Sequence, residues 1–150
     1  MTLVASERPV ALLLFSAHGL PKKFVDRGDP NVEHPKATHD AILARLNVSN
    51  RHVFGFQSRT GPVEWIGPGT EQVIKELGQE GVKEVLVVPL SFVSDHIKTL
   101  YEVDMLFRDD AERAGIVDYR RTDALNTHPI FIEALAGLVE RHVMETACPT

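Results

Sequence analysis

The sequence predicts an α/β fold in which a doubly wound, four-stranded parallel sheet carries helices on both faces. Short apolar runs alternate with longer segments whose apolar residues recur at helical spacing. A strand followed by a helix, repeated four times, is typical of parallel sheets covered on both sides. The chain has 150 residues, 43% hydrophobic and 25% charged, which favours a single domain over residues 1–150.

The four predicted strands differ in the strength of their pattern. Residues 10–16 form a continuous apolar run, which is typical of a strand buried on both faces of a parallel sheet. Residues 52–57 form the second candidate. Residues 84–92 carry the strongest pattern, in which the strand ends at Pro89, and residues 117–121 carry a weaker one.

The segments between the strands have the periodicity of helices. The last of them begins at Pro129, and proline is favoured at the first position of a helix. Residues 145–150 are expected to form a frayed tail. The predicted helices are residues 35–46, 69–77, 97–114 and 129–144.

Composition excludes several classes of protein. The formal net charge of −5 and the absence of a basic run argue against general nucleic-acid binding. One cysteine, Cys148, cannot alone form a disulfide or hold a metal cluster, so no iron–sulfur cluster is expected in this chain. No run reaches the roughly 18 apolar residues of a membrane span. We therefore expect a soluble, cytoplasmic protein, and peripheral membrane contact stays open.

Three loops are candidates for a ligand site. In sheets of this kind, ligands bind beyond the carboxyl ends of the strands. The loops at 16–21, 57–62 and 91–96 each follow a strong strand and carry polar groups where a structural loop needs only turn residues. The sequence therefore predicts one site built from these loops.

Two histidines in these loops could carry chemistry. His18 lies between Ala17 and Gly19, whose small size leaves the imidazole accessible as a proton acceptor or metal ligand. It could equally be a solvated loop histidine. His96 could be held by a carboxylate or could hold a neighbour, whereas Ser94 or Asp95 could simply cap the next helix.

Two further features have both a structural and a functional interpretation. Lys98 and Glu102 are four residues apart on an acidic helix, which could be a solvated face or a set of carboxylates that attracts hard cations. Trp65, the one tryptophan, lies in a Gly/Pro-rich loop. It could anchor that loop or offer a flat face to a flat ligand.

Taken together, these segments resemble the C-terminal lobe of ferrochelatase, a class II chelatase. They occur in family order over nearly the whole chain. The matching segments are residues 15–21 (Phe-Ser-Ala-His-Gly-Leu-Pro), 27–30 (Arg-Gly-Asp-Pro), 57–62 (Gln-Ser-Arg-Thr-Gly-Pro), 65–68 (Trp-Ile-Gly-Pro), 89–97 (Pro-Leu-Ser-Phe-Val-Ser-Asp-His-Ile), 99–104 (Thr-Leu-Tyr-Glu-Val-Asp) and 125–126 (Leu-Asn).

The resemblance implies a chelatase-like lobe that inserts ferrous iron, the substrate metal, into a porphyrin. It implies catalytic roles for His18 and His96 and a metal-binding role for His18 and Glu102. It places Ser58, Trp65 and Phe92 against the porphyrin. The partners implied are a porphyrin and either a missing N-terminal lobe or a second copy of the chain.

Two positions depart from the family pattern. Lys98 stands where family members usually carry a glutamate that partners the active-site histidine, and Leu106 stands where a third acidic residue would fall. A lysine repels Fe²⁺ unless burial deprotonates it. Two alternatives therefore stand beside the leading hypothesis of an iron-inserting lobe: a non-catalytic porphyrin- or metal-binding lobe, and a single-lobe chelatase that dimerises.

Overall fold

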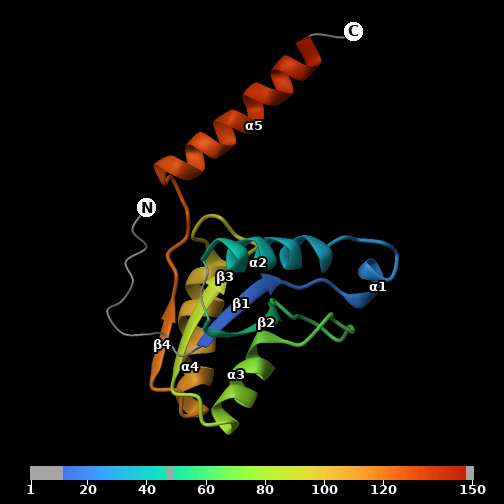
Figure 1. The fold of residues 1–150 in the computed structure, drawn as a ribbon. Coiled ribbons are helices and arrows are strands. Elements are labelled where there is room, and N and C mark those ends of the chain that lie inside the picture. Colours follow the sequence, from blue (N-terminus) through green and yellow to red (C-terminus); the bar gives the residue numbers. More distant parts are fainter. Residues whose placement is uncertain (1–11, 47–48, 148–150) are drawn as a thin grey trace.

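Within residues 12–46 and 49–147, which the computed structural model describes, four parallel strands form one sheet (Figure 1). The strand order is β2-β1-β3-β4, so the predicted parallel α/β fold is confirmed. The strands are β1 (Leu12–His18), β2 (Arg51–Gln57), β3 (Glu84–Pro89) and β4 (Asp118–Arg121). Residues 10 and 11 of the predicted first strand lie outside the described residues.

Strand β1 lies in the centre of the sheet. It pairs with β2 from Leu12 to His18 on one side and with β3 on the other. Leu14 and Phe15, which point to opposite faces, are both completely buried. This two-sided burial explains why the strand is a continuous apolar run rather than an alternating one.

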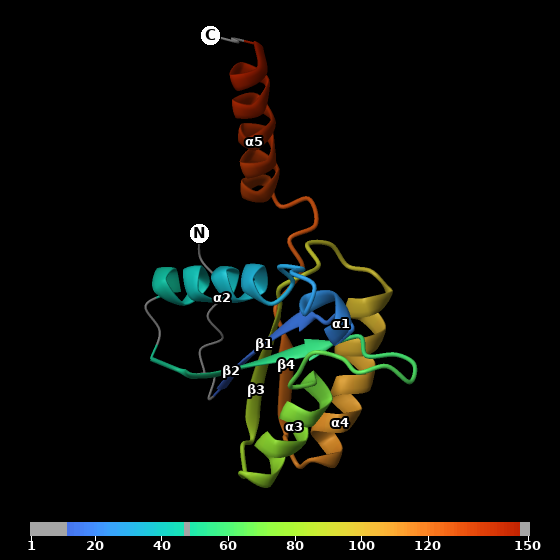
Figure 2. The same cartoon turned by 90° about the vertical axis from the view of Figure 1, so that its right-hand side faces the viewer.

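Two helices cover one face of the sheet, α3 (Thr70–Gln79) and α4 (Phe107–Arg113) (Figure 2). The apolar residues of α3 lie on one side, and Ile74 is completely buried in the main core. The start of α3 comes very close to β2. A Cβ atom at Gly55 would lie 2.9 Å from the Thr70 hydroxyl oxygen, so only glycine fits this contact.

The opposite face carries α2 (Glu33–Leu46), as the two views together show (Figures 1 and 2). No residue of α2 is buried, but the His39 ring contacts Phe15 edge-on at 4.6 Å. A short helix, α1 (Lys22–Val25), precedes it and was not predicted. Four residues span barely one helical turn and cannot display a helical periodicity.

The predicted helix over residues 97–114 is divided in two. Its first part is a π-helix, η1 (Lys98–Leu106), and only the second part is the α-helix α4. The π-helix is rare and is frequently found at functional sites. The sequence pattern could not predict this division, because helical periodicity and propensity refer to the ordinary α-helical turn.

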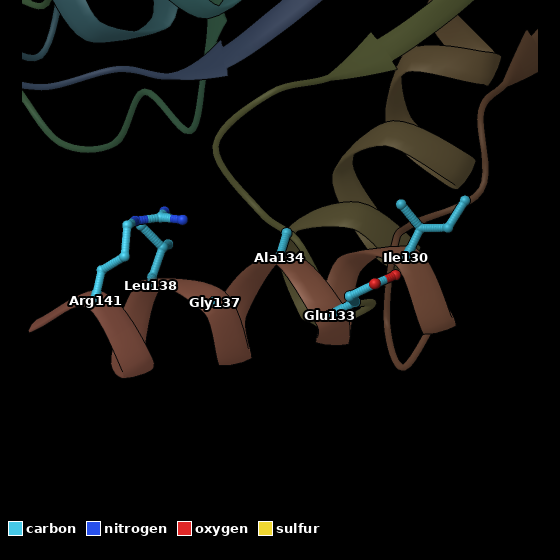
Figure 3. Close-up of a pocket in the computed structure, with 6 residues that line it drawn as sticks. All are labelled: Ile130, Glu133, Ala134, Gly137, Leu138 and Arg141. Carbon is cyan, nitrogen blue, oxygen red and sulfur yellow. The ribbon is translucent and has the colours of Figure 1, made fainter. Parts of the chain in front are cut away.

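The final helix, α5 (Pro129–Ala147), extends away from the sheet (Figures 1 and 2). Its large apolar side chains are 42% to 74% exposed: Ile130, Ile132, Leu135, Leu138, Val139, Val143 and Met144. One side of the helix forms a shallow hollow over Ala134 and Gly137, with Glu133 and Arg141 at its border (Figure 3). A helix that is apolar on several sides is normally covered by other elements.

The last described residue of the chain is Ala147, at the end of α5. Residues 145–147 of the predicted frayed tail are helical and belong to α5, so the prediction is wrong for them. Residues 148–150, including Cys148, lie outside the described residues, and for these the frayed tail stays a prediction. Among the helices of the described segments, none is both long and apolar enough to cross a bilayer.

Candidate functional site

The strand order explains where the site lies. Because β1 lies between β2 and β3, the chain leaves β1 toward one side of the sheet and leaves β3 toward the other. The loops after these two strands therefore diverge, and such a switch point is where doubly wound sheets bind ligands. His18 ends β1, and the segment with Phe92 and His96 follows β3.

Three aromatic rings form a row at this edge. The Phe92 ring lies edge-on to His18 at 5.4 Å between centroids and edge-on to His96 at 4.1 Å. The backbone N–H of His18 donates to the Ser91 hydroxyl at 2.7 Å, which fixes one loop to the other. The structure thus brings His18, Phe92 and His96 together.

The His18 imidazole is suited to act in its neutral form. Burial lowers its pKa from the ordinary value of 6.5, and the nearby Lys98 cation lowers it further, against the opposing effect of Glu102. Its Nδ1 atom is buried and has no hydrogen-bond partner among the described residues. A neutral imidazole keeps one unprotonated ring nitrogen, which can accept a proton or bind a metal ion.

Glu102 is held by two neighbours. One carboxylate oxygen accepts a hydrogen bond from the Ser58 hydroxyl at 2.8 Å, and the other lies 2.8 Å from the Lys98 ammonium. Ser58 has a left-handed backbone, φ 71°, which is uncommon for a residue with a side chain and occurs at functional sites. The Glu102 carboxylate is therefore already neutralised by a resident cation.

His96 is held by backbone rather than by a carboxylate. Its ring Nδ1 atom accepts a hydrogen bond from the backbone N–H of Lys98 at 3.1 Å. The backbone N–H of His96 donates to the Thr99 hydroxyl at 2.9 Å. A neutral histidine whose Nδ1 accepts carries its proton on Nε2. His96 therefore presents a donor, whereas His18 offers an acceptor.

The predicted capping role of Ser94 or Asp95 is wrong. No side-chain cap precedes η1. The Asp95 carboxylate instead accepts a hydrogen bond from the Asn126 amide at 3.0 Å and pairs with Arg121 at 3.3 Å. These partners are 26 and more positions away in sequence, so a local pattern could not reveal them.

Trp65 lies beside the turn that follows His18. Its indole N–H donates to the Thr60 carbonyl at 3.0 Å, and its backbone forms an antiparallel bridge with Pro21. A Cβ at Gly19 would lie 3.7 Å from the indole ring. Trp65 thus anchors its own loop, and its ring borders a hollow between β2 and α1 that is lined also by Phe54 and Phe56.

Sequence reasoning missed the polar residues that connect these parts. Ser16 donates to Gln57 at 2.9 Å inside the core, and the Gln57 amide in turn donates to the Lys98 carbonyl at 3.5 Å. Both side chains are 1% exposed. A polar residue at the carboxyl end of an apolar strand is the signal that could have identified them, because such a group must find a partner.

Metal binding would depend on few groups. His18 and Glu102 are the predicted metal-binding pair, and Lys98 occupies one oxygen of Glu102. Across residues 12–46 and 49–147, no three His, Cys, Asp or Glu side chains form a group that could hold a metal ion.

A family model named ferrochelatase matches residues 3–143. The chain belongs to the ferrochelatase family. Similar curated ferrochelatases include those of Rippkaea orientalis, 50% identical over 91% of this chain, and Geotalea daltonii, 51% identical over 90%. These matches cover 35% and 42% of the two relatives, so the chain spans less than half the length of either ferrochelatase.

The fold has a counterpart among solved structures. A putative cobalamin (vitamin B12) biosynthesis CbiX protein from Marinobacter aquaeolei VT8 aligns with a TM-score of 0.56 at 13% identity. The alignment covers 89% of this ferrochelatase-family chain and 98% of the other chain. At this identity the likeness concerns the fold alone.

Proposed function

We propose that this chain is one lobe of an enzyme that inserts ferrous iron into a porphyrin. The row of His18, Phe92 and His96 at the switch point of a ferrochelatase-family sheet carries the proposal. It places a proton acceptor, an aromatic face and a proton donor side by side. A flat tetrapyrrole with two pyrrole N–H groups needs these three functions.

The chemistry of each side chain determines its proposed role in metal insertion. When Fe²⁺ enters the macrocycle, two pyrrole protons leave. Neutral His18 accepts one of them, or holds the metal before transfer, and the other passes to solvent water. Phe92, Trp65 and Ser58 contact the porphyrin, and His96 orients it through its Nε2–H. Glu102 binds the metal together with His18 once the Lys98 ammonium withdraws.

A second lobe would complete the site. The chain spans 35% of one ferrochelatase relative and 42% of another, and the apolar side chains of α5 are uncovered. Apolar surface of this extent is normally buried against a partner. The proposed partner is an N-terminal lobe of the same family. The single cysteine fits a cytoplasmic location, which cell fractionation would check.

Two alternatives each have an observation in their favour. A homodimer of single lobes fits the structural neighbour, which is matched over 98% of its chain, because a two-fold axis could rebuild a two-lobed cleft. A non-catalytic porphyrin- or metal-binding lobe fits the Lys98–Glu102 pair, because the lysine reduces the attraction for a divalent cation.

One experiment separates the three functions. The molar mass of the chain is measured by sedimentation, and metallation of free-base porphyrin by Fe²⁺ is followed anaerobically from the visible spectrum. A monomer active only with an added N-terminal lobe supports the proposal, and an active dimer supports the homodimer. Porphyrin binding without metallation under both conditions contradicts iron insertion. His18→Ala is the matched control.

A further inference from the structure

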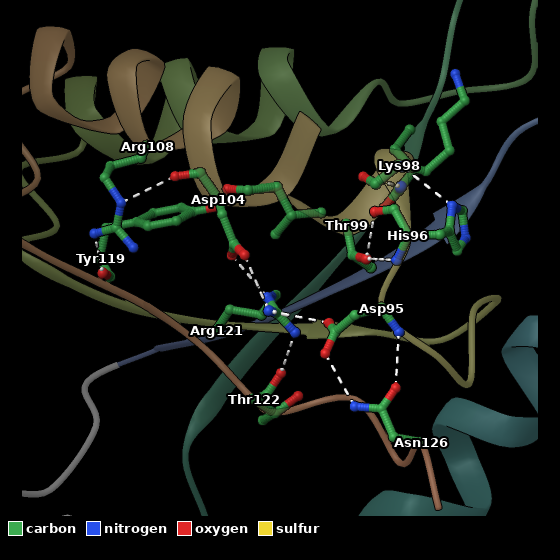
Figure 4. Close-up of polar contacts among 12 residues, drawn as sticks. Asp95, His96, Lys98, Thr99, Asp104, Arg108, Tyr119, Arg121, Thr122 and Asn126 are labelled. Atoms are coloured by element: carbon green, nitrogen blue, oxygen red, sulfur yellow. Dashed lines mark hydrogen bonds and ion pairs between the residues drawn. The ribbon is translucent and has the colours of Figure 1, made fainter. Parts of the chain in front are cut away.

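A cluster of polar side chains joins the chain before α5 to the candidate site. Arg121 ends β4, and its guanidinium donates two hydrogen bonds to the Asp104 carboxylate at 2.7 and 3.0 Å (Figure 4). The same guanidinium lies 3.3 Å from Asp95. One cation therefore binds both the π-helix and the loop that carries His96.

Asn126 holds the same loop from the other side. Its amide accepts a hydrogen bond from the Asp95 N–H and donates to the Asp95 carboxylate, both at 3.0 Å. Its backbone N–H donates to the Val93 carbonyl at 2.8 Å. Asn126 makes these three bonds with a left-handed backbone, φ 45°, a conformation that asparagine tolerates better than most residues.

The cluster is well placed to fix the His96 ring. Asp95 immediately precedes His96, and the ring's Nδ1 accepts its hydrogen bond from Lys98, the first residue of the π-helix. That bond joins the end of the loop to the first residue of the helix, so a shift of the loop against the helix would alter it. Arg121 binds both of them, and its side chain is only 12% exposed, so solvent screens the ion pairs little.

We propose that Asn126 and Arg121 are positioning residues that hold His96 in its Nε2–H form and direct that N–H toward the porphyrin. The inference rests on the proposed iron insertion for its functional meaning. The structural part of the inference does not depend on that function: it says that the tautomer of His96 depends on two residues that do not touch the ring. No other described contact of Asn126 gives it a different purpose.

The test compares three variants of the full chain. Asn126→Gly removes the amide but keeps the left-handed backbone favourable, and Arg121→Lys keeps the charge but loses the two-pronged bond to Asp104. Arg108→Lys is the control. Arg108 also spans the helix and β4, but it donates only to the carbonyls of Asp104 and Tyr119.

The readout is the pair of ring ¹⁵N chemical shifts of His96 at a fixed pH where the ring is neutral. In the unaltered chain and in Arg108→Lys, the shifts are those of the Nε2–H form. In Asn126→Gly and Arg121→Lys, the two shifts move toward each other as the Nδ1–H form becomes populated. Circular dichroism confirms that each variant is folded, and Asn126→Gly suffices if Arg121→Lys unfolds.

Unchanged His96 shifts in folded Asn126→Gly overturn the inference, and so does an equal change in Arg108→Lys. Metallation by the reassembled enzyme is the second readout. A positioning role predicts that Asn126→Gly lowers kcat more than it raises KM. If the unaltered chain fails to metallate porphyrin while the His96 shifts respond as expected, the proposed function fails and the positioning role stands.

Discussion

The α3 side of the sheet and the loops at its carboxyl edge involve the same strands but differ in composition and burial. On the α3 side, Leu14, Ile74 and Val87 are completely buried and belong to one apolar core cluster. At the edge, His18 and Glu102 are partly exposed, and the Glu102 carboxylate binds the Ser58 hydroxyl and the Lys98 ammonium. We infer that folding energy comes mainly from the first region and chemistry from the second, so changes in one should leave the other nearly unaffected.

The largest expected effect is on activity, from His18→Ala. Loss of the imidazole removes a proton acceptor and metal ligand, and general acid–base residues contribute about 10²- to 10⁴-fold to rates. The free energy of unfolding should change by about 0.5 kcal/mol or less, because a partly exposed side chain at a strand end packs little. Metallation assays and denaturant unfolding of the same preparation measure both. A loss of unfolding free energy as large as the one that corresponds to the activity loss would contradict the separation of folding energy from chemistry.

The opposite pattern is expected for Ile74→Ala. This side chain is completely buried in the core, and truncating such a residue costs about 2–5 kcal/mol. The midpoint of urea unfolding should fall, whereas the metal affinity of the remaining folded protein should stay the same. Ile132→Ala on exposed α5 is the matched control, and it should barely change unfolding of the isolated chain.

Lys98→Glu should strengthen divalent-metal binding at the edge without a large change in stability. The lysine ammonium lies 2.8 Å from Glu102, and replacing it turns a competing cation into a second carboxylate. Two unit charges about 4 Å apart interact by roughly 4 kcal/mol at an effective dielectric near 20. Because Lys98 is 32% exposed, solvent reduces this effect, and we expect roughly a tenfold change, or about 1.4 kcal/mol.

Titration calorimetry with a divalent metal at fixed salt and pH measures this affinity. Lys98→Gln separates the two contributions, since it removes the cation without adding a carboxylate, and its affinity should fall between the other two. Weaker binding in the glutamate form would mean that Lys98 does not compete for the Glu102 carboxylate.

The smallest effect is a pH dependence of stability due to His18. Its pKa in the folded chain lies below 6.5, so the unfolded state binds more protons in the interval between the two pKa values. Its stabilising contribution is complete above the unfolded pKa and is lost as the pH falls through the folded pKa. As the pH falls from 7 toward 5, the native chain should therefore lose unfolding free energy relative to His18→Ala. A difference independent of pH would contradict the lowered pKa.

Local patterns predicted most of the elements. Three patterns lie each within a single element: the continuous apolar run in β1, the proline at the end of β3, and the helical spacing of Val73, Ile74 and Leu77 in α3. Because each depends only on neighbouring residues, it predicted the strand or helix that forms there. The π-helix was missed because its hydrogen bonds reach one residue farther than the α-helical pattern. The exposure of α5 was missed because an apolar periodicity indicates a face to be covered, without naming what covers it.

Strand periodicity was enough to predict the parallel α/β class, and the rule that such sheets bind ligands at one edge was enough to predict the loops that hold the candidate site. The folded chain is needed to see how those side chains are joined: Phe92 between two imidazoles, Ser58 and Lys98 on one carboxylate, and Arg121 on the π-helix and the loop before it. Each pairing connects different strand-to-helix segments or depends on the π turn. Long-range partners are fixed by the strand order and packing of the whole domain, which no local stretch of sequence contains.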